Sequence, residues 1–442
     1  INENGTIARF LEGEHALLPT SYYQTTLPAL LSRNASELSP GRDVELKQVR
    51  QASHQNIDLA QALTVHSQTI TSQPMAASAE DLLDKALQAN GFDSAQHEQI
   101  RCDIRTGRIG LAQNRLPPSS TIEDVSTEEL LDATADTPTK WHDTGMDALA
   151  SGKVAVVSLA GGAGSRWTRG AGVVKALNPF AQFDGRHRNF LEVHLAKTRK
   201  TTQLCGQVIP HIVTTSYLTN APLEEWLQVS GAELHLSPGR YVGLRTIPMI
   251  RDLRFNWEEM PQQILDEQAQ KMQESLRDAL IEWARNSGEG SDYRDNLPLQ
   301  CMHPVGHWYE IPNLLRNGVL AGILDEYPNL EHLLVHNIDT LGTDLSPALL
   351  GAHIESGADL TFEVIQRQLD DRGGGLAKVN GLNRIIEGLS LPSEECEFDL
   401  SWYNTLTNWV NLPGLLRFFR LEKADLADEV KVARAIREAA AR

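Results

Sequence analysis

The chain has 442 residues and a formal net charge of -18 at pH 7, because 58 acidic side chains outnumber 40 Lys and Arg side chains. This balance argues against nucleic acid as a partner, since a phosphate backbone is bound through an excess of cations. No run of about 18 apolar residues occurs, so we expect no membrane span. The length suffices for one large domain with additions, or for two or three domains.

The cysteines are few and scattered, at Cys102, Cys205, Cys301 and Cys396. No Cys-x-x-Cys pair and no Cys/His metal-ligand spacing accompanies them, so we expect reduced thiols in a cytoplasmic protein rather than disulfides. The first residues, Ile1 to Gly5, have neither the basic start nor the apolar core of a signal peptide.

The first 140 residues are predicted to form an N-terminal helical and peripheral region. Residues 1 to about 75 are polar and rich in Ser, Gln, Thr and Asn, which favours a partly ordered segment. From Ser78 a capping box and apolar periodicity predict a helix that ends at Asn90-Gly91. A second helix is expected to reach Arg108, and a third to cover residues 123–132.

A buried strand followed by glycines dominates the middle of the chain. The continuous apolar run Val154–Ala160 is typical of a strand buried on both faces in a parallel sheet. Glycines and cations follow it, at Gly161, Gly162, Gly164, Arg166, Arg169 and Lys175. Glycines let backbone N–H groups approach an anion closely, and the cations favour a polyphosphate ligand. The pattern therefore predicts a phosphate-binding loop.

Two commoner glycine motifs do not fit this stretch. The dinucleotide fingerprint G-x-G-x-x-G, counted from Gly162, reaches Trp167 where its third glycine should stand. The ATP-binding loop G-x-x-x-x-G-K-[ST] also fails, because residues 154–175 contain no Gly-Lys pair. A glycine turn between a strand and a helix, without a ligand, is the structural alternative.

The stretch Trp141–Arg166 resembles the nucleotide loop of the UDP-sugar pyrophosphorylases, the family of UTP–glucose-1-phosphate uridylyltransferases and UDP-N-acetylhexosamine pyrophosphorylases. The likeness lies in Gly-Lys-Val-Ala-Val, Leu-Ala-Gly-Gly and the order strand, G-G-x-G-[ST]-R, lysine. It implies an α/β fold of the nucleotidyltransferase, glycosyltransferase-A-like Rossmann type: a mixed, mostly parallel central sheet flanked by helices, with an N-terminal helical region.

The resemblance also implies the domain limits and the roles of the loop. Residues 141–420 would form the catalytic domain and residues 421–442 a helical tail, with the C-terminal domain of the family missing. Arg166 and Lys175 would be catalytic cations. The nucleotide would contact the end of the strand and the loop, at Leu159, Ala160, Gly161, Gly162 and Gly164.

The following segments predict further elements of the same sheet. A helix is expected to begin at Phe190, and residues 208–215 are expected to form the next buried strand. Strand, helix and strand at this spacing form a βαβ unit, which requires a parallel sheet. Residues 255–286 read as a long, charge-rich helical excursion interrupted by Pro261.

A second segment, His303–Trp308, resembles the Pro-Pro-Gly-His-Gly segment of the same family. It keeps Gly306 and His307, which the resemblance places over the uridine and the phosphates, and it replaces the following Gly-Asp by Trp308-Tyr309. A lone histidine is more often a structural residue. Its place in a Pro-x-Gly-His turn favours the nucleotide-binding role.

A third segment, Leu333–Gly342, is an apolar strand that ends in Asn-x-Asp and looks like Asn-Ser-Asp-Asn-Leu-Gly of the family. A carboxylate at the C-terminal end of a parallel strand faces the ligand crevice, where Mg²⁺ would bridge it to phosphate oxygens. We therefore expect Asp339 to be the metal ligand and Asn337 to contact the sugar or ribose. In the alternative, Asp339 caps the following turn.

The last segments resemble the sugar-binding part of the family. Asp371–Leu376 is similar to Lys-Gly-Gly-Thr-Leu, and an Asn380-Gly381 hairpin leads to the strand that Glu387 closes. The resemblance gives sugar contacts to Gly374 and Glu387. Residues 402–412 are similar to Phe-Asn-Thr-Asn-Asn-Leu-Trp-Val-Asn-Leu, from which Asn404 is carried over as a further sugar contact.

The sequence thus predicts a Mg²⁺-dependent uridylyltransferase that makes a UDP-sugar and pyrophosphate from UTP and a sugar 1-phosphate, with glucose 1-phosphate favoured. Alternatives are N-acetylglucosamine 1-phosphate or another sugar, another base on the same scaffold, and a sugar-nucleotide-binding protein that has lost catalysis. No glutamine that would read uracil stands at residues 236–239. The sugar and the oligomeric state stay open.

Overall fold

The computed structural model describes residues 79–440 except 134–136, 165–173, 240, 259–266, 305, 369–370, 372 and 393. The predicted catalytic Arg166 and the polar segment before residue 79 lie outside the described residues. The predicted boundary between an N-terminal region and a catalytic domain at residue 141 stays a prediction.

Parallel strands form the centre of a nine-stranded sheet whose main path is β1-β11-β13-β9-β2-β5-β6. The parallel part consists of β9 (His332–Asn337), β2 (Val154–Leu159), β5 (His211–Thr214) and β6 (His235–Ser237). Strand β2 is buried along its whole length between β9 and β5. The predicted α/β fold with a mixed central sheet flanked by helices is confirmed.

Antiparallel strands extend the sheet beyond β9. They are β13 (Trp402–Asn411), β10 (Leu360–Gln366), β11 (Gly375–Val379), β12 (Leu382–Ile386) and β1 (Ile122–Glu123). The expected hairpin turn joins β11 to β12, with φ of 49° at Asn380 and 80° at Gly381. Such left-handed angles favour Asn-Gly in a two-residue hairpin loop.

The helix predicted over residues 123–132 is wrong. In its place the chain forms strand β1 and a 3₁₀ turn at Thr127–Glu129. The edge of β11 takes up the segment, with Ile122 opposite Val379, and Thr121 exchanges two hydrogen bonds of 2.9 Å with Asn380. Pairing with a distant strand has overridden the local helical pattern.

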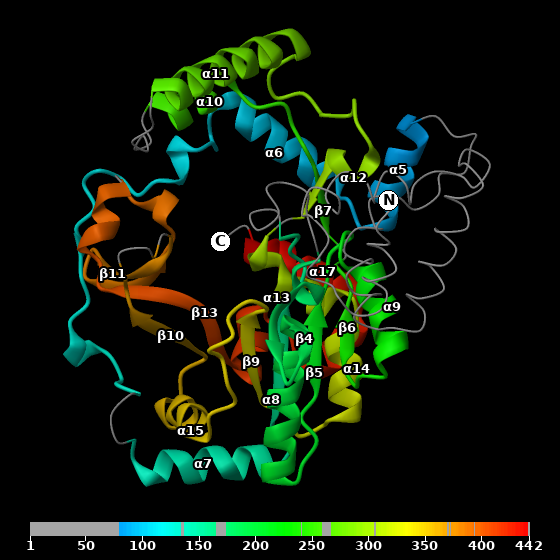
Figure 1. Cartoon of the computed structure of the whole chain (residues 1–442), viewed down its shortest axis with the longest axis vertical. Helices are drawn as coiled ribbons and strands as arrows, with labels where there is room; N and C mark the ends of the chain where they lie inside the picture. The colour runs from blue at the N-terminus through cyan, green and yellow to red at the C-terminus, as the bar shows by residue number, and fades with distance from the viewer. Residues whose placement is uncertain are drawn as a thin grey trace.

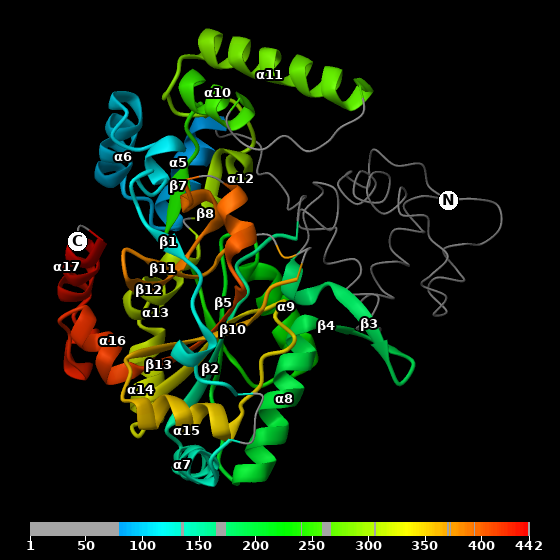
Figure 2. The ribbon, with the colours of Figure 1, turned by 90° about the vertical axis from the view of Figure 1, so that its left-hand side faces the viewer.

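Helices cover both faces of the sheet, since alternate residues of β2 join separate cores. Ala155 and Val157 pack with α13 (Glu310–Arg316), α14 (Val319–Glu326), α16 (Leu412–Phe418) and α17 (Glu429–Ala440). Val154 and Val156 face α7 (Thr139–Ala150) and α15 (Pro347–Ser356), and α8 (Phe190–Cys205) and α9 (Asn220–Ser230) cover the same face further along. Figure 2 shows α16 and α17 on one side of the sheet and α8 and α9 on the other.

A separate layer lies beyond the C-terminal ends of the parallel strands, at the top of Figure 1. It contains α5 (Ala79–Ala89), α6 (Ser94–Thr106), α10 (Ile250–Glu258), α11 (Glu267–Ser287), α12 (Pro298–Cys301), β7 (Val242–Leu244) and β8 (Met302–Pro304). The predicted helices after Ser78 and before Arg108 are confirmed as α5 and α6. A hairpin of β3 (Pro179–Phe183) and β4 (Arg186–Asn189) projects from the sheet in Figure 2. Among the described helices, none combines the length and apolar character that crossing a bilayer requires.

Helices α7 and α15 approach each other closely through two glycines, at the bottom of Figure 1. A Cβ at Gly145 of α7 would overlap the Pro347 carbonyl, and a Cβ at Gly351 of α15 would overlap the Trp141 carbonyl. Because the obstructing atoms are backbone, no rotamer change can relieve either clash. The two helices can pack this closely only if both positions are glycine.

We expect Gly145→Ala to lower the free energy of unfolding by about 1–3 kcal/mol, as overpacking of an interior does. The matched control is Gly322→Ala on α14, where no atom lies within 4 Å of the added Cβ. That variant should be neutral or should gain roughly 0.5–1 kcal/mol, because alanine loses less backbone entropy on folding. Urea unfolding of both variants measures the difference, and equal stabilities would contradict the close contact.

Candidate active site

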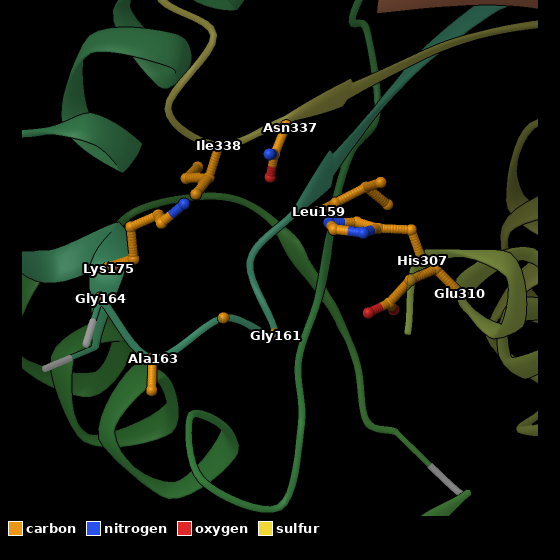
Figure 3. Close-up of a pocket in the computed structure, with 10 residues that line it drawn as sticks. Leu159, Gly161, Ala163, Gly164, Lys175, His307, Glu310, Asn337 and Ile338 are labelled. Carbon is orange, nitrogen blue, oxygen red and sulfur yellow. The ribbon is translucent and has the colours of Figure 1, made fainter. Parts of the chain in front are cut away.

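A cavity of about 160 Å³ opens where β2 and β9 end side by side, with Leu159 paired to Asn337. Ligands of open α/β sheets bind beyond the carboxyl ends of the parallel strands, which is where this cavity lies. It is lined by Leu159, Gly161, Gly162, Ala163, Gly164, Lys175, His307, Glu310, Asn337 and Ile338 (Figure 3). All but Ala163, Glu310 and Ile338 were predicted to belong to the site.

The glycine loop leaves consecutive backbone amides open toward the cavity. The N–H groups of Gly161, Gly162 and Ala163 donate to no acceptor within the described part of the chain. The carbonyls beside them are satisfied: the Gly161 oxygen accepts from Ser216 Oγ at 2.7 Å and the Gly162 oxygen from Lys175 N at 3.3 Å. Because these carbonyls are hydrogen-bonded, the peptide groups are fixed in orientation. The free N–H groups can therefore form a rigid cradle for an anion.

Lys175 and Asp339 form an ion pair at the end of this cradle. Lys175 begins a 3₁₀ turn (Lys175–Leu177), Asp339 follows β9, and Nζ lies 2.7 Å from Oδ2. Their side chains are 15% and 28% exposed, so the pair is accessible from the cavity. No backbone amide donates to the Asp339 carboxylate within the described residues, so the turn-cap alternative is not what the structure shows.

His307 lies on the opposite wall of the cavity, in the 3₁₀ turn His307–Tyr309. Gly306 precedes it with φ of 87°, a left-handed angle that favours glycine. The walls of the cavity partly desolvate the His307 ring, which lowers its pKa below the usual value, and the Lys175 ammonium lowers it further, whereas the Asp339 and Glu387 carboxylates act in the opposite direction. The ring is therefore neutral near pH 7 and can donate a hydrogen bond from one nitrogen.

The three predicted sugar contacts from the antiparallel strands lie together. A Cβ at Gly374 would stand 3.0 Å from Glu387 Oε1, and the Asn404 amide donates to the Gly374 carbonyl at 3.3 Å. None of the three residues lines the cavity itself. The Glu387 carboxylate is nevertheless close enough to His307, which does line it, to raise the pKa of that ring. The Asn404 side chain accepts from the Leu406 amide at 3.1 Å, so part of its hydrogen-bonding capacity is used within its own strand.

A buried ion pair that the sequence analysis missed holds this second cluster. Arg367 Nη1 lies 2.9 Å from Glu397 Oε1, both side chains are 7% exposed, and the same carboxylate accepts from the Gly373 amide at 2.8 Å. Arg367 Nη2 also donates to the Gly374 carbonyl at 3.3 Å. No local pattern could reveal the pair, since its members follow different strands.

Glu310 is a second residue that the sequence analysis missed. It is the first residue of α13, and its side chain enters the cavity beside Gly161 (Figure 3). Burial raises the pKa of its carboxyl group to about 7. An acidic residue at the start of a helix is ordinarily a solvent-exposed partner of the free amides, so sequence alone gave no reason to single it out.

A buried hydrogen-bond chain supports the wall formed by Asn337 and Ile338. Ser158 Oγ lies 2.8 Å from the Nε2 atoms of both His211 and His336. His336 Nδ1 must donate to the Asn337 carbonyl at 2.9 Å, so a neutral His336 accepts the Ser158 hydroxyl at Nε2. His211 then donates from Nε2 to Ser158, and its Nδ1 accepts from Thr198 at 2.9 Å.

This assignment satisfies every member of the hydrogen-bond chain while both imidazole rings are neutral. The effect of burial on the two pKa values is consistent with neutral rings. Burial lowers the pKa of His211 to about 3 and holds that of His336 well below its usual value. A third ring, His194, donates to the Ile338 carbonyl at 2.9 Å, and burial lowers its pKa to about 4. The carbonyls of Asn337 and Ile338 are thereby fixed by imidazole donors.

Comparison with known families finds a match over residues 291–438 to the model described as UTP–glucose-1-phosphate uridylyltransferase. A protein of that name from Saccharomyces cerevisiae is 30% identical over 153 residues, which are 31% of this chain and 30% of the yeast protein. UTP–glucose-1-phosphate uridylyltransferase 2 of Dictyostelium discoideum is 28% identical over 140 residues, 30% of this chain and 28% of its own. The match thus spans less than a third of the length of these relatives.

Solved structures give likenesses over more of the chain. A mutant UDP-glucose pyrophosphorylase from Leishmania major in complex with UDP-glucose is 19% identical, with a TM-score of 0.48, over 78% of this chain and 66% of that one. A protein described as a putative UDP-N-acetylglucosamine pyrophosphorylase, from Entamoeba histolytica, is 16% identical, with a TM-score of 0.47, over 67% of each chain.

The buried histidines predict loss of stability in acid. An unfolded histidine protonates as the pH falls past about 6.5, whereas His194 in the folded protein protonates only near pH 4. The unfolded state therefore binds more protons in this window, and the free energy of unfolding falls as the pH falls. His194→Gln keeps an amide donor for the Ile338 carbonyl but cannot titrate.

We expect that variant to reduce the slope of unfolding free energy against pH between 6.5 and 4 by up to about 1.4 kcal/mol per pH unit, the equivalent of one proton. Urea unfolding at several pH values measures the slope for wild type and variant. An unchanged slope would show that His194 is not buried in neutral form.

Proposed function

We propose that the chain belongs to the UDP-sugar pyrophosphorylase family and that it transfers the uridylyl group of UTP to a sugar 1-phosphate, most readily glucose 1-phosphate. The match over residues 291–438 supports this proposal. The products are a UDP-sugar and pyrophosphate. The observation that carries the proposal is the position of the Lys175–Asp339 pair, 2.7 Å apart, at the end of a cradle of open amides.

The reaction requires little covalent chemistry from the protein. A sugar-phosphate oxygen, already anionic, forms a bond to the α-phosphorus of UTP, and the bond to the pyrophosphate oxygen breaks in line, so no general base is required. Two polyanions must be brought together while the leaving group gains charge, which makes positioning and electrostatic stabilisation the main contributions. The amides of Gly161, Gly162 and Ala163 and the Lys175 ammonium supply donors and positive charge for this purpose, and Arg166 stays a predicted partner.

The donor set at Asp339 fits a magnesium ion that arrives bound to the triphosphate. No group of three or more His, Cys, Asp or Glu side chains able to hold a metal occurs among the described residues. Mg²⁺ at phosphoryl-transfer sites commonly takes only one or two carboxylates and completes its shell with phosphate oxygens and water. We propose that Asp339 would be that carboxylate, that the ion would neutralise phosphate charge there, and that the Lys175 ammonium would bind the phosphates.

The sugar would lie between the cavity and the antiparallel strands. The proximity of Glu387 to Gly374 supports a role for its carboxylate as an acceptor of sugar hydroxyls, with the glycine leaving room for the ring. Asn337 at the end of β9 and Asn404 on β13 would complete the contacts, and neutral His307 would donate to the phosphate or the ribose. The cytoplasmic location stays a prediction from the cysteine pattern.

One observation favours a second candidate, a sugar-nucleotide-binding protein without turnover. Leu406 has φ of 56°, a left-handed angle that a leucine rarely adopts, in the segment where the resembling motif carries asparagine. A site with leucine in place of asparagine at this position would still bind ligands without catalysing their reaction. Binding of UTP without conversion would identify this case.

Pyrophosphorolysis tests the proposed reaction directly. The protein is supplied with pyrophosphate, Mg²⁺ and separately with UDP-glucose, UDP-N-acetylglucosamine and ADP-glucose, and triphosphate release is measured. We expect UTP from UDP-glucose at the highest rate. Release of triphosphate from none of them, with the nucleotide sugars nevertheless bound, would establish the binding protein instead.

Lys175→Ala should lower turnover by roughly 100-fold or more with little change in stability, because it removes a positive charge that acts on the transition state. Its matched control is Lys153→Ala, at the opposite end of β2, where Lys153 pairs with Glu331 at 3.0 Å. That variant loses an ion pair beside the same strand and should keep turnover. Steady-state rates for both variants decide the matter, and a near-normal rate for Lys175→Ala would remove the lysine from the mechanism.

A further inference from the structure

Glu310 lines the cavity and has one carboxyl oxygen, Oε2, that is buried in the wall without a hydrogen-bond partner among the described residues. The Thr214 hydroxyl is near enough to favour the ionised form, yet it makes no hydrogen bond of standard geometry and is itself without a partner. A buried acceptor of this kind destabilises the folded protein when it stays unsatisfied. If the carboxyl group rotates toward a ligand that supplies the missing donor, the lost free energy is recovered.

The Glu310 carboxyl group lies close to Gly161, where any side chain would crowd it. A Cβ at Gly161 would stand 3.1 Å from Glu310 Oε1 and 3.5 Å from the Cβ of Ser216. The bare glycine and the carboxyl group therefore form one corner of the cavity, next to the open Gly161 amide. The apolar side chain of Leu159 borders the cavity nearby (Figure 3).

Charge separates this corner from the other end of the cavity. Lys175 lies across the cavity from Glu310 in Figure 3, and no cation is among the groups that shift the Glu310 pKa. We expect phosphate groups to bind at the lysine and the amides, since an ionised carboxyl group without a cation repels them. The corner at Glu310 instead suits an uncharged part of the ligand that offers a hydrogen-bond donor.

We propose that Glu310 is the base-reading residue of the site, and that its carboxyl group pairs with the N3–H and a neighbouring carbonyl of uracil. The proposal rests on the function proposed above. In this arrangement the carboxyl group rotates so that both oxygens face the ring: one oxygen accepts from N3–H, and the protonated oxygen donates to the ring carbonyl, so two parallel hydrogen bonds form. The proton is available near neutral pH, because burial already raises the pKa of the group to about 7.

Uracil fits this corner better than ribose does. The ribose hydroxyls would also donate to a carboxyl group, but they gain nothing from a second oxygen that is protonated and donates. The imide edge uses both the acceptor and the donor, and the ring faces pack against apolar surface such as Leu159. A contact with the ribose would instead show as a dependence on the 2′-hydroxyl.

The test compares UTP with N3-methyl-UTP, which carries the same triphosphate and ribose but cannot donate from N3. Dissociation constants with Mg²⁺ are measured by titration calorimetry for wild type, Glu310→Gln and Glu310→Leu, with 2′-deoxy-UTP as a third ligand. Wild type should prefer UTP over N3-methyl-UTP by roughly 10-fold or more, which corresponds to about 1.4 kcal/mol or more.

Glu310→Gln keeps one donor and one acceptor and should retain most of that preference, whereas Glu310→Leu should reduce it to about 2-fold or less. The matched control is Glu363→Gln, a second buried glutamate whose pKa burial raises, hydrogen-bonded to Trp409 at 2.8 Å on β10. It should leave the preference at the wild-type value. Discrimination against 2′-deoxy-UTP should be equal in wild type and Glu310→Leu.

Several outcomes would overturn the proposal. Equal binding of UTP and N3-methyl-UTP by the wild type would do so without any variant, even if Glu310→Leu failed to fold. A preference that survives in Glu310→Leu, or one that moves to the 2′-hydroxyl, would assign the carboxyl group to another contact while UDP-sugar formation stayed intact. Absence of both UTP binding and turnover in the wild type would instead remove the proposed function, and this inference with it.

Discussion

The ion pair between Lys175 and Asp339 joins two segments that are far apart in the sequence, and the rest of the site depends on it. It exists because β2 and β9 are neighbouring parallel strands in register, so that the loop after one and the turn after the other begin at the same level of the sheet. The open amides of the glycine loop then face the same space as the carboxylate. An antiparallel pairing of these two strands would have placed the loop and the turn at opposite edges of the sheet.

The sheet also fixes the wall of the cavity beside these groups. On the side of α8, polar residues replace the apolar ones that a buried face normally carries, and Ser158, His211 and His336 are fully hydrogen-bonded together with Thr198 and the Asn337 carbonyl. This hydrogen-bond chain ends at the main-chain carbonyl of Asn337, so the buried polar groups fix a residue of the cavity wall. A fully satisfied network of this kind favours one arrangement, because each alternative leaves a buried group without a partner.

Much of the fold and part of the site could be predicted from sequence because their signals are local. The apolar run of β2, the glycines behind it and the Asn-x-Asp at the end of β9 each lie within a few residues, and the parallel pairing follows from the βαβ spacing. The helix expected over residues 123–132 was wrong since β11, more than 240 residues later, supplies the pairing edge. Glu310 and the Arg367–Glu397 pair escaped notice for the same reason: what distinguishes them is burial and partnership with distant segments, which no window of sequence contains.

The crossing of α7 and α15 limits which sequences this fold can accept in the course of evolution. Gly145 and Gly351 each meet the main chain of the opposite helix, at Pro347 and Trp141, and a main-chain atom is the same in every sequence. A larger residue at either position therefore has no compensating substitution at the facing position. The two glycines should drift neither singly nor as a coupled pair, unlike side-chain contacts, where a gain of volume on one side can be matched by a loss on the other.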